Sequence, residues 1–77
     1  MTMQDDGLDE GRAMGKVSAL QREKGFGFIN HPESGQDYFF HKSEALGIWD
    51  TVQQYDTVTF RPGKGPKGPR ATEVELP

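Results

Sequence analysis

Lys24-Gly25-Phe26-Gly27-Phe28-Ile29 is the stretch on which the fold prediction depends. In a strand, alternate side chains point to opposite faces, so Phe26 and Phe28 share one side and Ile29 lies on the other. Two rings then stand side by side over glycine backbone. Such a pair can fill a core, or it can form a surface on which unpaired bases stack, with Lys24 at the edge to meet a phosphate.

Length and composition predict one small domain. The chain has 77 residues, about a third of them apolar, so the core must be small. It has no cysteine, which excludes a disulfide framework and a thiolate metal site and fits a reducing cytoplasm. The first residues are acidic where a signal peptide needs a basic flank, and no apolar run is long enough to span a bilayer. We therefore expect a cytoplasmic protein with no membrane partner.

The net charge of −3 is unevenly distributed. Four acidic residues, Asp5, Asp6, Asp9 and Glu10, lie in the first ten positions without a basic residue among them. From residue 11 onward nine Lys and Arg face eight Asp and Glu, and Arg61, Lys64, Lys67 and Arg70 follow one another with no acid between them. The acidity therefore belongs mostly to the N-terminus, and a local basic stripe remains that suits a nucleic-acid partner.

Residues 1–12 are polar and aperiodic, so we expect a disordered acidic tail before a domain at 13–77. This tail is either a solvated leader or an arm that competes with nucleic acid for the basic stripe.

The domain reads as all-β. Five short strands are expected at 14–21, 25–31, 37–41, 56–61 and 71–76. Turn residues at 32–36 predict a hairpin, and 42–47 has room for one helical turn. The glycine- and proline-rich segment at 62–69 is expected to be a long basic hairpin loop. Five strands without a substantial helix favour a small antiparallel barrel.

The aromatic residues are too many for one small core. Taken alone, each ring is more often core than binding surface, but a barrel filled by all of them would have no room for its aliphatic residues. Alternation offers a division, with Phe26, Phe28, Phe39 and His41 outside on neighbouring strands. The residues expected inside are Val17, Ile29, Tyr38, Phe40, Val58, Phe60, Val74 and Leu76.

The same residues match a known family. Lys24-Gly25-Phe26-Gly27-Phe28-Ile29 is similar to the first ribonucleoprotein motif, and Tyr38-Phe39-Phe40-His41 resembles the second motif of bacterial cold-shock proteins. In an RNA-recognition-motif domain the second motif comes first in the chain and a helix precedes the first motif. The order here is the reverse, which resembles the cold-shock domain, a five-stranded antiparallel OB-fold barrel. The family usually has Val-Lys-Trp-Phe-Asn where this chain has Val17-Ser18-Ala19-Leu20-Gln21, so a stacking tryptophan is absent at Ala19.

The resemblance implies a monomeric binder of single-stranded RNA and DNA, with low sequence selectivity, a preference for pyrimidine-rich strands and an RNA-chaperone activity. The expected nucleic-acid-binding residues are Lys24, Phe26, Phe28, Asp37, Phe39, His41, Trp49, Lys67 and Arg70. The alternative is a protein-interaction barrel in which nucleic-acid binding is weakened.

Other chemistry has little support in the sequence. His31, Asp37 and His41 are poor evidence for a metal site, because two histidines lack an assured third ligand. His41 and Ser43 lack the partner that would orient a catalytic base. Gly25 and Gly27 lack the third glycine and the helix of a dinucleotide loop. We expect no enzyme, no cofactor and no small-molecule substrate.

Overall fold

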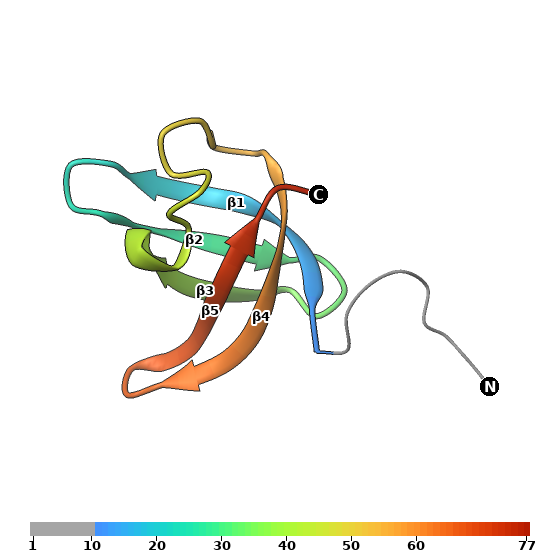
Figure 1. Ribbon diagram of the computed structural model, residues 1–77. Helices are drawn as coiled ribbons and strands as arrows, with labels where there is room; N and C mark the ends of the chain where they lie inside the picture. The colour runs from blue at the N-terminus through green and yellow to red at the C-terminus, as the bar shows by residue number, and fades with distance from the viewer. Residues whose placement is uncertain (1–10) are drawn as a thin grey trace.

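The computed structural model describes residues 11–77. Its elements are β1 (Ala13–Gln21), β2 (Phe26–His31), β3 (Gln36–His41), the 3₁₀ turn η1 (Lys42–Glu44), β4 (Thr57–Gly65) and β5 (Gly68–Glu75). The strands close into a barrel in the order β1-β2-β3-β5-β4 (Figure 1). Neighbouring strands are antiparallel except β3 and β5, which run parallel. The expected five-stranded all-β barrel is therefore confirmed, with one parallel pairing.

The core follows from the alternation of side chains along the strands. Its buried apolar residues are Val17, Ile29, Phe40, Ala45, Val52, Val58, Phe60, Ala71 and Val74. Tyr38 is partly buried and packs against this cluster. Leu76 is an exception to the prediction, since 43% of it is exposed. β5 ends at Glu75, so alternation no longer determines the direction of the next side chain.

A bulge in β1 decides which face Ala19 occupies. Val17 is paired with the buried Ile29, whereas Ala19 is paired with Phe28 on the outer face. In a regular strand Val17 and Ala19 would share a face, but the register shifts between them, at Ser18. The Ser18 hydroxyl donates a 3.4 Å hydrogen bond to the carbonyl oxygen of Phe28. The bulge therefore adds Ala19 to the outer surface of the barrel.

The segment at 62–69 is not the long loop that its glycines and prolines predicted. β4 continues to Gly65 and β5 begins at Gly68, so the hairpin loop is Pro66 and Lys67 alone. Pairing of β4 with β1 ends at Phe60. Beyond that residue β4 has β5 as its partner and the other edge of the strand is open, which is where a strand tolerates a residue without N–H such as Pro62. The two strands project together as a hairpin at the lower left of Figure 1.

Arg12 joins the start of the domain to β4 and β5. Its guanidinium donates 2.8 Å hydrogen bonds to the Thr59 hydroxyl and to the carbonyl oxygen of Glu73. Only 7% of the Arg12 side chain is exposed, so this residue belongs to the folded domain rather than to the tail. Residues 1–10 lie outside the described residues, and their expected disorder stays a prediction. No helix within 11–77 is long and apolar enough to cross a membrane.

Candidate nucleic-acid interface

Four rings lie on the outer face of β2 and β3, and the three phenylalanines among them are in mutual contact. Strand register places Phe26 opposite His41 and Phe28 opposite Phe39. The ring centroids of Phe26 and Phe39 are 5.5 Å apart, and those of Phe28 and Phe39 are 5.8 Å apart. All four rings are half-buried. We call Phe26, Phe28, Phe39 and His41 the stacking platform, because their outer faces lie where flat groups can stack.

Gly27, between the two phenylalanines of β2, faces the inside of the barrel and leaves room there for a core ring. A Cβ atom at Gly27 would lie 2.8 Å from the ring of Phe40 and 2.7 Å from the carbonyl oxygen of Ala19. A side chain at this position would therefore displace a core ring. The same strand thus supports the platform on one face and admits the Phe40 ring on the other.

His41 is oriented by the turn that follows β3. Its Nδ1 accepts a 3.1 Å hydrogen bond from the backbone N–H of Ser43, and the Ser43 hydroxyl lies 3.0 Å from the same nitrogen. Because Nδ1 accepts, the proton of the neutral ring lies on Nε2. The ring can therefore stack and also donate one hydrogen bond from its far edge.

Polar residues continue the platform toward the other end of the strands. Asn30 is opposite Asp37, two residues along from the Phe28–Phe39 pair, so both share the platform face. Asn30 Nδ2 donates a 3.0 Å hydrogen bond to Asp37 Oδ1. Lys16 of β1 is paired with Asn30 and is exposed. The aromatic surface therefore ends in a row of hydrogen-bonding and charged groups.

A pocket of about 500 Å³ lies between the platform and the β4–β5 hairpin. It is lined by Phe28, Asp37, Phe39, Gly65, Pro66, Lys67, Gly68, Pro69 and Arg70. The Arg70 guanidinium carbon is 6.0 Å from the centroid of the Phe39 ring, close enough for a cation–π contact. Five of the predicted binding residues, Phe28, Asp37, Phe39, Lys67 and Arg70, therefore meet at one pocket.

The basic stripe is divided by its contacts. Arg61 Nε lies 3.1 Å from the Glu73 carboxylate, so part of its charge is compensated. Lys64 and Lys67 are exposed on the hairpin. Within the basic stripe, the positive charge that faces solvent therefore lies toward the end of the β4–β5 hairpin, beside the pocket.

Trp49 packs against the core of the barrel. Its half-buried ring packs edge-on against the buried Phe40, with 6.1 Å between the ring centroids. Arg22 donates hydrogen bonds to the carbonyl oxygens of Trp49 and Val52, and its guanidinium carbon is 6.0 Å from the Trp49 ring. Sequence reasoning missed Arg22, because the contact depends on the path of the segment between η1 and β4. A role of Trp49 in binding bases stays a prediction.

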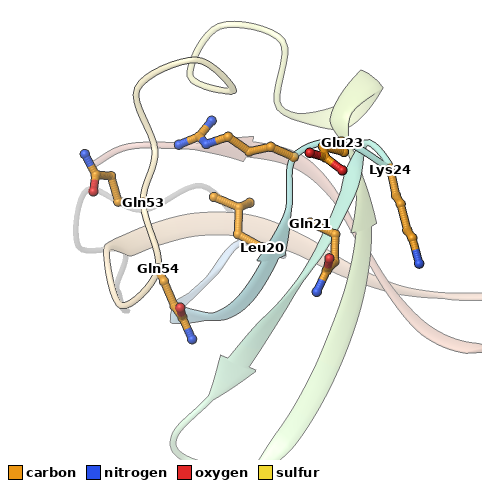
Figure 2. A pocket seen from close by; sticks show the side chains of 7 residues that line it. Leu20, Gln21, Glu23, Lys24, Gln53 and Gln54 are labelled. Atoms are coloured by element: carbon orange, nitrogen blue, oxygen red, sulfur yellow. The ribbon is translucent and has the colours of Figure 1, made fainter.

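Lys24 extends from the turn between β1 and β2. It lines a shallow pocket of about 420 Å³ together with Leu20, Gln53 and Gln54, and Figure 2 shows its ammonium end pointing away from those three side chains. The residue is exposed, and it lies two positions before Phe26. This arrangement leaves the Lys24 ammonium in solvent near one end of the platform.

Comparison with known proteins matches this chain to one family. The family model described as "'Cold-shock' DNA-binding domain" matches residues 13–77. The chain belongs to the cold-shock domain family. That membership confirms the resemblance seen in the two motifs and supports nucleic-acid binding in general.

Similar cold-shock proteins come from several bacteria. The "Cold shock protein" of Arthrobacter globiformis is 45% identical over 65 residues, covering 83% of this chain and 97% of that protein. The "Probable cold shock protein A" of Mycolicibacterium smegmatis is 41% identical over 61 residues, covering 78% and 91%. The "Cold shock-like protein CspA" of Bordetella pertussis is 39% identical over 63 residues, covering 80% and 94%. This cold-shock domain therefore corresponds to nearly the full length of each of these relatives.

Proposed function

We propose that this cold-shock domain binds single-stranded RNA and DNA and acts as an RNA chaperone. The observation that carries the proposal is the stacking platform, three phenylalanines and an oriented histidine on the outside of a small barrel. Half-exposed rings of this kind cost stability if nothing covers them, and base faces are flat groups of matching size. Bases held on the platform are removed from pairing, which shifts hairpins toward open forms without consuming ATP.

Charge complements stacking in this proposal. Lys24 at one end and Lys67 at the hairpin contact phosphates, while Phe26, Phe28, Phe39 and His41 stack bases. Stacking is tolerant of sequence, since every base has an aromatic face, so selectivity is low, with pyrimidine-rich strands preferred. We further propose that the protein acts as a cytoplasmic monomer and is not an enzyme.

The direct test measures binding to a labelled heptathymidylate by fluorescence anisotropy. We expect saturable binding that weakens as salt rises, and much weaker binding to a duplex of the same length. Phe28→Ala or Phe39→Ala is expected to cost about 1–3 kcal/mol of binding free energy with the fold retained.

The matched control is Tyr55→Ala. Tyr55 is 72% exposed on the segment before β4, so its loss removes an exposed ring away from the platform. We expect its affinity to equal that of the unmodified protein. Absence of binding to the single strand at low salt would refute the proposal and favour the protein-interaction barrel. Unfolding of Phe28→Ala would show that the ring is a core residue.

Chaperone activity needs a second measurement. An RNA hairpin with a fluorophore and a quencher at its ends reports opening directly. We expect fluorescence to rise on addition of the protein without ATP, and to rise less with Phe28→Ala. Binding without opening would leave a single-strand binder that is not a chaperone.

A further inference from the structure

The pocket beside Phe39 contains charges of both signs. Asp37 lines it from β3, and Lys67 and Arg70 line it from the β4–β5 hairpin. Among residues 11–77, no ion pair joins Asp37 to either cation. Opposite charges that face one pocket without meeting leave space for a ligand that has both hydrogen-bond donors and acceptors.

Asp37 presents acceptors to this pocket. Asn30 Nδ2 donates to Asp37 Oδ1 and so fixes the orientation of the carboxylate. In the part of the chain that the structure describes, Asp37 Oδ2 takes no hydrogen bond, and each carboxylate oxygen has two lone pairs. The carboxylate can therefore accept two hydrogen bonds from one ligand edge.

Arg70 presents donors from the other side. Register places Arg70 directly opposite Phe39 across the parallel β3–β5 pairing. Gly65 gives its stem room, since a Cβ there would lie 3.3 Å from Arg70 Cδ. Within the described residues the guanidinium makes a ring contact with Phe39 and no hydrogen bond or ion pair. Its N–H groups are therefore available to a ligand stacked beside Phe39.

We propose that this pocket takes a guanine base, so that binding has a preference for guanine at one nucleotide position. Guanine offers two neighbouring donors, N1–H and the N2 amine, to the Asp37 carboxylate, and two acceptors, O6 and N7, to the Arg70 guanidinium. Phe28 and Phe39, whose rings stand at 75° to each other, supply the apolar walls of the pocket. The inference rests on the proposed single-strand binding and adds a specificity that stacking alone does not give.

The other bases match the pocket less well. Uracil and thymine offer the carboxylate one N–H donor, flanked by carbonyl oxygens that Asp37 repels. Cytosine and adenine carry a ring-nitrogen acceptor next to their amine, which also faces the carboxylate unfavourably. Guanine alone presents paired donors on one edge and paired acceptors on another.

The test replaces one thymine at a time in heptathymidylate by guanine and measures anisotropy. We expect one position at which guanine tightens binding about tenfold, the effect of one good base-edge contact. At that position, inosine, which lacks the N2 amine, and 7-deazaguanine, which lacks N7, each lose part of the gain.

Two variants assign the contacts. In Asp37→Asn, guanine and inosine are expected to bind equally, because the paired acceptor is gone. In Arg70→Met, guanine and 7-deazaguanine are expected to bind equally. The matched control is Lys64→Met, which removes one charge from the same hairpin without touching the pocket lining. This control is expected to weaken all strands alike and keep the guanine preference.

The outcomes separate this inference from the function on which it rests. Failure to bind heptathymidylate itself would refute single-strand binding. Normal binding of heptathymidylate with no gain from guanine at any position would refute the guanine pocket alone. The guanine preference could also survive in both Asp37→Asn and Arg70→Met, with both proteins folded by circular dichroism. Other residues would then select guanine, and the proposed guanine pocket would be refuted.

Discussion

Gly27 leaves space in the core on the inner face of β2, between two phenylalanines that point to the outer face. Its missing side chain admits Phe40 to the core while Phe26 and Phe28 remain outside. The distances predict a penalty for any larger residue, since a Cβ would lie 2.7 Å from a backbone oxygen and 2.8 Å from the Phe40 ring. The glycine is therefore required for packing.

We expect Gly27→Ala to lower the free energy of unfolding by about 1–3 kcal/mol, because the core is overpacked. The matched control is Gly47→Ala, since a Cβ at Gly47 meets nothing within 4 Å. Its effect is expected within about 0.5 kcal/mol of zero. Urea unfolding of both variants measures the difference, and equal stabilities would contradict the close contact at Gly27.

Ala19 is the residue at which this chain departs most clearly from the family's stacking surface. The bulge at Ser18 places it opposite Phe28, on the platform side. We expect Ala19→Trp to tighten binding to heptathymidylate by one to two powers of ten, since a stacked base contributes about 1–3 kcal/mol. The gain should be nearly independent of salt.

Ala19→Lys is the comparison for that prediction. A lysine at the same position also strengthens binding, but through phosphate attraction, so its gain should fade as salt rises. Unchanged affinity in a folded Ala19→Trp protein would mean that the bound strand does not cross β1.

At the scale of elements, Arg22 ties the β1–β2 turn to the segment between η1 and β4. It donates to two backbone carbonyl oxygens and lies over Trp49, the single tryptophan of the chain. The Trp49 ring also packs against Phe40. Arg22 therefore adds to the contacts that this segment makes with β1, where the Tyr55 N–H donates to the Val17 carbonyl oxygen.

We expect Arg22→Met to destabilise the protein by about 1–3 kcal/mol, because charge-assisted hydrogen bonds to two carbonyl groups are lost. Trp49 emission should move to longer wavelength as the ring gains water contact. Lys24→Met is the control, since that side chain extends away into solvent (Figure 2). An emission maximum that is unchanged or shifted to shorter wavelength in Arg22→Met would show that Trp49 does not depend on Arg22 for its position.

Sequence patterns predicted the elements whose side chains alternate without interruption. Ile29 and Phe40 lie inside as expected, because each falls within a strand whose pairing with its neighbour is regular. The prolines and glycines of 62–69 were misleading, since an open strand edge tolerates residues that a central strand excludes. The bulge at Ser18 and the contacts of Arg12 and Arg22 depend on strand register and loop path, which local patterns do not encode.

At the scale of the whole molecule, charge is divided between the N-terminus and the domain. Removing residues 1–10 changes the formal net charge from −3 to +1, because these residues contain four acids and no Lys or Arg. We expect this deletion to leave the melting temperature nearly unchanged and to tighten strand binding slightly at low salt. The gain should vanish near 1 M salt, where the Debye length is about 3 Å.

Deleting residues 1–12 is the matched comparison. It also removes Arg12, whose buried guanidinium bonds to Thr59 and Glu73, so the melting temperature should fall. Equal melting temperatures for the two deletions would show that the Arg12 contacts contribute no stability. A large drop on removing residues 1–10 alone would show that the acidic segment is docked on the domain.

β3 and β5 are matched at a single residue pair, Phe39 and Arg70, whereas β2 and β3 are matched at six. Both members of that pair line the pocket between the stacking platform and the β4–β5 hairpin. The barrel therefore has the fewest paired residues at the place where we expect a nucleic-acid strand to bind. A nucleic-acid strand that contacts both Phe39 and Arg70 would connect β3 to β5 and so stabilise this part of the barrel. Amide protons of β5 near Arg70 should then exchange with solvent faster than those of β2 in the free protein, and slow sharply on binding. Separation of β3 from β5 would then require the bound strand to leave one of the two residues first.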